Sequence, residues 1–264
     1  IYFILNFKKH KWKFLHPILY ILVVLIVGFS WFLLEIARGR GYIVQEFIDY
    51  HIRLFSESEA GHGQPFYYHP LVLLFGCFPM SLFFIYGWFN RSESSSRIAH
   101  YSKWMTILFW VVLIAFSIVK TKIVHYSSLT YFPMSFLTAV TVQNLLDGKW
   151  KFKPVHQIPL LLFIALLGSG FVLLGILDKI KQPLLRVLEN DLLGYGNFSQ
   201  QIPDGLFDAF IGLFFMFAAM AAVFLLIIGR SEKGIIGLFG TTLVTVMLLS
   251  IVIVPKIDRY TQTS

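Results

Sequence analysis

The sequence carries few charges for its length. Only 14% of its 264 residues are Asp, Glu, Lys or Arg, whereas about 25% is usual for a soluble domain. In addition, 57% of the residues are hydrophobic. They gather into runs of roughly 16 to 24 residues, the length at which an α-helix crosses a hydrocarbon core about 30 Å thick. The composition excludes an ordinary soluble enzyme and predicts an all-α, polytopic integral membrane protein.

Other absences narrow the chemistry. Cys77 is the single cysteine, so no intrachain disulfide can form. There is no Gly-x-x-x-x-Gly-Lys-Ser/Thr loop, which argues against ATP as an energy source. Neither Gly-x-Ser-x-Gly nor His-Glu-x-x-His occurs, which argues against a hydrolase or a zincin. The net charge of +8 comes largely from loop Lys and Arg, which suit anionic headgroups better than nucleic acid. We therefore expect membrane lipids as partners, with no nucleotide cofactor and no nucleic acid.

About seven segments are predicted to be transmembrane helices. They are Pro17–Ala37, Pro70–Phe89, Trp104–Val119, Ile123–Leu146, Ile158–Leu177, Leu206–Ile228 and Ile235–Val254. With the N-terminus in the cytoplasm, the short inner segments hold 12 of the 22 Lys and Arg residues. The longer outer segments hold the other 10 and most of the acids. This bias predicts a cytoplasmic N-terminus and a C-terminus outside.

The outer segments show helical patterning of their own. Residues 38–69 contain YIVQEFIDYHIRLF, whose apolar residues recur at helical spacing, so we expect an amphipathic helix on the outer surface. Residues 178–205 contain KQPLLRVLENDLLGYG and predict a second short helix. Residues 255–264 turn polar after the last span, and we expect them to begin an external domain. We interpret residues 1–264 as one transmembrane domain of a longer chain, which also fits a start at Ile rather than Met.

One stretch, FSIVKTKIVHYSSLTYFP (residues 116–133), places charge between apolar segments. Helices on either side of Thr121 would form a tight hairpin, with Lys120 and Lys122 at the outer membrane face and Tyr126 about one turn deeper. Two interpretations follow from the residues alone. The lysines and the tyrosine are interface anchors, or they converge on a phosphate at headgroup level.

A second stretch, HIRLFSESEAGHGQPFYYHP (residues 51–70), gathers histidines, acids and aromatic rings. A metal site is conceivable because His and carboxylate ligands suit zinc or manganese, although the spacing matches no defined metal motif. Tyr67 and Tyr68 suit stacking on a sugar face, or equally a place in the aromatic belt of the interface.

Taken together, HIRLF, GHGQPFYYHPLVLLFGCFPMS and FSIVKTKIVHYSSLTYFP occur in the order seen in a known family. The chain resembles, from Ile43 to Ala139, the second half of polyprenyl-phosphate-sugar-dependent glycosyltransferases of the GT-C class. This group contains the lipid A aminoarabinose transferases and the protein O-mannosyltransferases. The residues that carry the resemblance are Arg53, Phe55, His62, Pro65, Phe66, Tyr67, Tyr68, Pro79, Phe116, Ser117, Lys120, Lys122 and Tyr126.

The resemblance implies transfer of a sugar from a polyprenyl-phosphate donor to a lipid, protein or glycan acceptor. It places the chain in a bacterial cytoplasmic (inner) membrane, with the active face outside. Positive charge must stabilise the departing phosphate, a role that the resemblance gives to Lys120, Lys122 and Tyr126. Arg53, Tyr67 and Tyr68 are further substrate-binding candidates.

The same resemblance implies two components that are less visible in the sequence. Catalytic carboxylates are expected in an acidic loop upstream of residue 1, so the catalytic residues of this chain are unknown. A divalent metal near the site would be held by His62.

Two other function classes remain open. A multispan transporter or lipid flippase predicts inverted repeats and interrupted helices around a midplane site. A non-catalytic membrane subunit would use Lys120 and Lys122 only to anchor a helix end.

Overall fold

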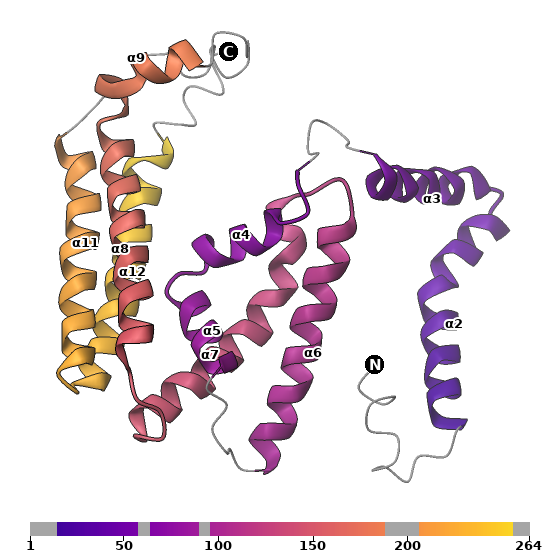
Figure 1. Ribbon diagram of the computed structural model, residues 1–264. Coiled ribbons are helices and arrows are strands. Elements are labelled where there is room, and N and C mark those ends of the chain that lie inside the picture. The colour runs from indigo at the N-terminus through magenta and orange to yellow at the C-terminus, as the bar shows by residue number, and fades with distance from the viewer. Residues whose placement is uncertain (1–14, 58–63, 90–95, 188–205, 256–264) are drawn as a thin grey trace. The chain divides into compact units, whose positions relative to one another are not determined.

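The structure is a computed structural model that describes residues 15–57, 64–89, 96–187 and 206–255 (Figure 1). Within these ranges every regular element is a helix and no β-strand forms. The prediction of an all-α, polytopic membrane protein is confirmed. The helices are α2 (Leu15–Ala37), α3 (Gly41–Ser56), α4 (Tyr68–Gly76), α5 (Met80–Phe89), α6 (Ser96–Ile118), the 3-10 helix η3 (Val124–Thr130), α7 (Tyr131–Leu146), α8 (Pro154–Gly175), α9 (Leu177–Val187), α11 (Leu206–Ile227) and α12 (Ser231–Val252).

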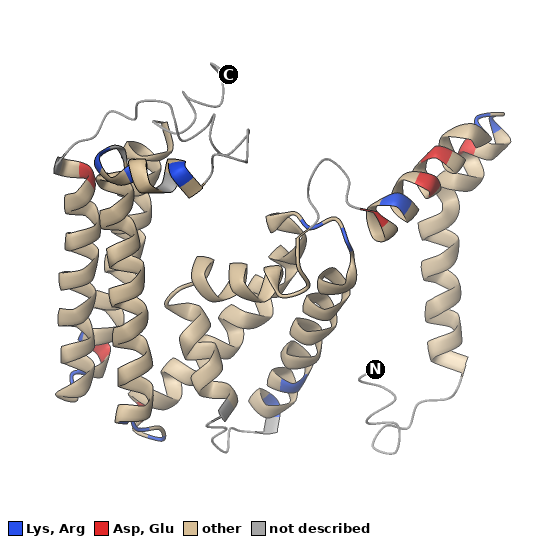
Figure 2. Cartoon of the chain, turned by 45° about the horizontal axis from the view of Figure 1, so that its top comes forward, with Lys and Arg blue, Asp and Glu red and all other residues tan. Residues whose placement is uncertain are grey.

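The described residues contain five helices that are long and apolar enough to cross a membrane. They are α2, α6, α8, α11 and α12, and α4 with α5 gives a sixth if the pair forms one broken span. Figure 2 shows Lys, Arg, Asp and Glu mainly near helix ends, in turns and on α3, while the middle of α2, α8, α11 and α12 carries none. This distribution keeps charge out of the hydrocarbon core.

Two of the seven predicted spans are not continuous α-helices. The segment Pro70–Phe89 is broken after Gly76, and α5 resumes at Met80. Pro79 explains the break, because proline lacks an N–H and disfavours helical backbone at the residue before it. The two short helices replace the single span that the apolar run predicts.

The segment Ile123–Leu146 begins with η3 and becomes α-helical only at Tyr131. In η3, Ser127 Oγ donates to Val124 O (3.1 Å) and Thr130 Oγ1 donates to Ser127 O (2.6 Å). Hydroxyl groups that bond nearby carbonyls compete with regular helix. The chain still turns at Thr121 and packs back on α6, but the second arm begins as a 3-10 helix and not as the predicted α-helix. The third predicted span, Trp104–Val119, is in contrast longer than expected, because α6 begins at Ser96.

The chain forms two compact units, Ile1–Cys77 with Glu93–Leu137 and Phe78–Ser92 with Thr138–Ser264. In the second unit α8, α11 and α12 pack side by side (Figure 1). Backbones approach closely at Gly175 and Gly212, where an added Cβ would meet backbone atoms of the facing helix. Gly229, at φ 82°, ends α11 and lets Arg230 N donate to Leu225 O (2.8 Å), so the chain turns directly into α12.

In the first unit, α2 exposes its apolar side chains along its length and buries only Glu35. Arg40 follows the helix and pairs with Glu35, with 2.9 Å between Nη2 and Oε1. Helix α3 occupies the part of residues 38–69 in which an amphipathic helix is predicted. Likewise α9 occupies the start of residues 178–205, while the rest of that segment and residues 256–264 lie outside the described residues.

Candidate anion site

The turn that carries the two lysines is tied to the end of α3. Lys120 N donates to Phe55 O (3.3 Å) and Thr121 N donates to Leu54 O (3.2 Å). The buried Thr121 hydroxyl adds a bond to Glu57 O at 2.8 Å. These bonds join segments about 64 residues apart and bring the last turn of α3, which contains Arg53, beside the lysine turn.

Lys120 and Lys122 have very different surroundings. Lys120 is exposed, whereas Lys122 is only 4% exposed. The Lys122 ammonium donates to Val119 O at 2.6 Å, and no carboxylate pairs with it within the described residues. A buried charge is costly unless it is paired and hydrogen-bonded. Lys122 is thus placed to gain from an anionic ligand, while Lys120 is placed as an interface anchor would be.

His69 lies at the start of α4 in the same unit. Its side chain is fully buried, and neither ring nitrogen has a hydrogen-bond partner. The ring contacts the edges of Tyr68 and Phe116, with ring centroids 5.3 Å and 6.5 Å away. Lys122 lies in the turn between α6 and η3, the two elements against which α4 packs. Ser117, next to Phe116 on α6, also buries a hydroxyl that has no partner.

The aromatic candidates surround this group unevenly. Tyr126 on η3 is half-buried and packs on Phe116, with ring centroids 5.6 Å apart. Tyr68 is half-buried beside His69, but Tyr67 is 51% exposed and contacts Phe66. Ring contacts thus run from Tyr68 through His69 and Phe116 to Tyr126, while Tyr67 lies at the periphery.

Sequence reasoning on the phosphate site missed His69 and Ser117. His69 was grouped only with the histidines of the conceivable metal site. One signal was available, an imidazole placed directly before Pro70 at the start of an apolar run. His62 lies outside the described residues. Within the described part of the chain, no three His, Cys, Asp or Glu residues are grouped to hold a metal.

The arrangement is rich in donors. An ammonium, a phenol and a hydroxyl can each donate a hydrogen bond, and so can an imidazole in either neutral tautomer. Hydrogen bonds from such groups to an ionised oxygen are shorter and stronger than bonds between neutral groups. Glu57 is the acid that ends α3 beside the turn, and it is exposed. We define Lys122, His69, Ser117 and Tyr126 as the anion cluster, whose chemistry suits a phosphate.

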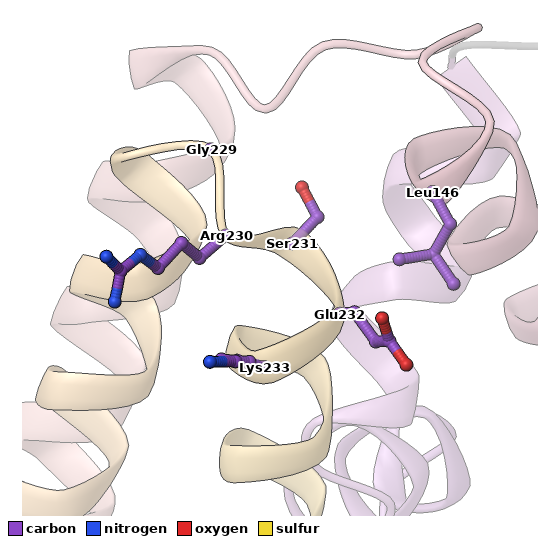
Figure 3. Close-up of a pocket in the computed structure, with 6 residues that line it drawn as sticks. All are labelled: Leu146, Gly229, Arg230, Ser231, Glu232 and Lys233. Atoms are coloured by element: carbon purple, nitrogen blue, oxygen red, sulfur yellow. The ribbon is translucent and has the colours of Figure 1, made fainter.

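A separate pocket opens at the start of α12 (Figure 3). It is lined by Leu146, Gly229, Arg230, Ser231, Glu232 and Lys233. Figure 3 shows Arg230 and Lys233 pointing to one side of the helix start and Glu232 to the other. None of its six lining residues has a buried polar atom without a partner, so its charges are those of an ordinary helix end.

Replacing Thr121 with Val should raise the KM for the donor of the transfer proposed below by about 2- to 10-fold, since one hydrogen bond contributes about 0.5–1.5 kcal/mol. The change removes the bond to Glu57 O and loosens the turn that positions Lys122. Thr130→Val is the matched control, because it removes a buried hydroxyl bonded within η3. Thr130→Val should lower the melting temperature about as much as Thr121→Val does, and should leave the KM for the donor unchanged. Equal KM effects in both variants would contradict a positioning role for the turn.

Comparison with known proteins gives partial matches to one group of enzymes. The chain is 31% identical over 144 residues to a protein of Pectobacterium carotovorum subsp. carotovorum (strain PC1), covering 52% of this chain and 25% of the relative. A Pectobacterium atrosepticum protein is 30% identical with the same coverage. A Wigglesworthia glossinidia brevipalpis protein is 29% identical over 128 residues, covering 44% of this chain and 22% of the relative.

All three proteins are named undecaprenyl phosphate-alpha-4-amino-4-deoxy-L-arabinose arabinosyl transferase. These names agree with the glycosyltransferase resemblance and give no support to its mannosyltransferase part. The matches span about a quarter of the length of the relatives. No family model and no solved structure matches the chain.

Proposed function

We propose that this chain forms the donor-phosphate site of a membrane glycosyltransferase that moves a sugar from a polyprenyl phosphate to an acceptor. The observation that carries the proposal is the buried Lys122 ammonium, which has no carboxylate partner among the described residues, in the same unit as the unpartnered His69 ring. Support also comes from the partial similarity to transferases whose names specify an undecaprenyl phosphate donor. We further propose 4-amino-4-deoxyarabinose as the sugar and a lipid A-type glycolipid as the acceptor.

The reaction requires negative charge to be stabilised on the leaving group. An acceptor oxygen attacks the anomeric carbon, the bond from that carbon to the donor phosphate oxygen breaks, and its electron pair stays on the phosphate. Any proton on the acceptor oxygen passes to a base, for which the resemblance implies a carboxylate. The phosphate begins as a singly charged diester and leaves as a doubly charged monoester.

This change in charge gives Lys122 its role. A fixed ammonium near the phosphate binds the leaving group more strongly than the donor, and binding that grows along the reaction accelerates it. The Tyr126 phenol can donate to a further phosphate oxygen. Lys120, which is exposed, attracts the anionic headgroup from the membrane surface. Arg53 and the rings of Tyr67 and Tyr68 lie on the segments that approach the turn and are proposed to contact the sugar or the headgroup.

The transporter alternative has one observation in its favour, the break between α4 and α5, because transporters use interrupted helices to build midplane sites. The anion cluster, however, comes from the start of α4, the end of α6, the turn after α6 and η3, and not from residues at the break. Groups at helix ends suit a headgroup phosphate better than a substrate at the midplane.

A transfer assay separates these functions. The full-length protein in lipid nanodiscs should convert an undecaprenyl phosphate–aminoarabinose donor and lipid A into glycosylated lipid A and free undecaprenyl phosphate, detected by mass spectrometry. A UDP-sugar in place of the lipid donor should give no product. Movement of intact donor across proteoliposomes, without cleavage, would favour the flippase instead.

A further inference from the structure

The burial of His69 has no explanation within the described fold. Buried polar groups in proteins are nearly always hydrogen-bonded. A neutral imidazole has one N–H donor and one nitrogen acceptor, and both ring nitrogens of His69 lack partners. The side chain does not cap α4, whose N-cap residue Tyr67 makes no capping bond either.

The neighbours of His69 point to the ligand that it lacks. Helix α4 packs against both α6 and η3, which brings His69 against Phe116. The adjoining Ser117 hydroxyl is buried without a partner, and Lys122 is a buried cation. Two donors beside an ammonium suit an oxyanion. Among the described residues, no second and third His, Cys, Asp or Glu join His69 to complete a set of metal ligands.

We infer that His69 is a phosphate-binding residue, whose ring N–H donates to an oxygen of the lipid-linked phosphate beside Lys122 and Ser117. This inference rests on the proposed function and extends it, since neither the family motifs nor the names of the relatives give His69 a role. A neutral imidazole adds a directed hydrogen bond without adding a second fixed charge to the buried cluster. The phosphate oxygen in turn is the hydrogen-bond acceptor that the His69 ring N–H lacks in the described fold.

Binding of undecaprenyl phosphate to the full-length protein in nanodiscs tests the inference, with undecaprenol as the ligand that lacks phosphate. His69→Leu keeps the volume and removes both nitrogens, and should weaken undecaprenyl phosphate binding by about 10- to 100-fold, the effect of a hydrogen bond to a charged group. His69→Gln keeps an N–H donor and should bind within about 5-fold of the wild type. Ser117→Ala, which removes one oxygen, should weaken binding by about 3- to 10-fold.

The melting temperature distinguishes binding from a structural role. Removing polar atoms that have no partner should leave the melting temperature of His69→Leu unchanged or higher. A lower melting temperature with weak binding in both His69 variants would show a structural role and overturn the inference. Wild-type binding by His69→Leu and Ser117→Ala, with binding lost in Lys122→Met, would overturn it and leave the proposed function standing. If the wild-type protein binds undecaprenyl phosphate no better than undecaprenol, the proposed function fails as well.

Discussion

Replacing Lys122 with Met should lower kcat/KM for sugar transfer by about 100- to 1,000-fold, the usual effect of removing one preorganised charge stabiliser in an active site. Met has a similar length and no charge. The ammonium is buried and has Val119 O as its hydrogen-bond acceptor, so among the described residues no anion is left without its partner when the ammonium is removed. The lost interaction is therefore the one made with the leaving phosphate, and kcat should fall more than KM rises.

Substitutions of two other lysines serve as controls for Lys122→Met. Lys120→Met removes an exposed charge two residues away, and should lower kcat/KM by less than about 10-fold because exposed ionic interactions contribute about 0–1 kcal/mol. Lys149→Met removes a surface lysine that pairs with Asp147 in the second unit and should leave transfer unchanged. The transfer rate and the amount of protein inserted into the membrane are measured separately for each variant. Equal losses of kcat/KM in Lys120→Met and Lys122→Met would contradict the prediction that the buried lysine contributes more to transfer than the exposed one.

The largest expected effect on stability lies in the bundle of α8, α11 and α12. Gly175→Ala and Gly212→Ala should each lower the melting temperature by about 2–12 °C, since overpacking costs about 1–3 kcal/mol. A Cβ at Gly175 would meet the Ala209 backbone, and one at Gly212 would meet the Val172 backbone. Backbone atoms cannot rotate aside as a side chain can, so the two helices must separate.

Gly170→Ala is the control within the same helix. Its Cβ would meet nothing within 4 Å, so the variant should melt at or slightly above the wild-type temperature, as alanine stabilises helices relative to glycine. Thermal unfolding of the protein in detergent compares the three variants. Similar losses at Gly170 and Gly212 would mean that helix flexibility, and not close packing of α8 on α11, explains these glycines.

The helices that are predictable from sequence are those whose whole length faces one environment. For α2, α8, α11 and α12, long apolar runs between charged turns are sufficient evidence. In the structure, the ends of these helices lie within a few residues of the predicted bounds. Pro79 also indicated a break, but the prediction of one span over Pro70–Phe89 followed the apolar composition and not the proline. In the segment before Tyr131, Ser127, Ser128 and Thr130 were counted as part of the apolar span Ile123–Leu146, so a 3-10 helix was not foreseen.

The site was predictable in kind but not in detail. The motif order placed Lys120, Lys122 and Tyr126 together, yet it treated the lysines as equivalent. Their difference arises from hydrogen bonds to Leu54, Phe55 and Glu57. Such long-range backbone pairing has no signature in composition or periodicity. His69 was missed for a related reason, because its burial depends on α6 and η3 covering the start of α4.

The most direct test of the account is a cryo-electron microscopy structure of the full-length protein with undecaprenyl phosphate. The phosphate should give density within about 2.6–3.2 Å of Lys122 Nζ, a hydrogen-bond distance, with the His69 ring next to it. Phosphate bound elsewhere, for example at Arg230 and Lys233, with Lys122 still bonded to Val119 O alone, would contradict it.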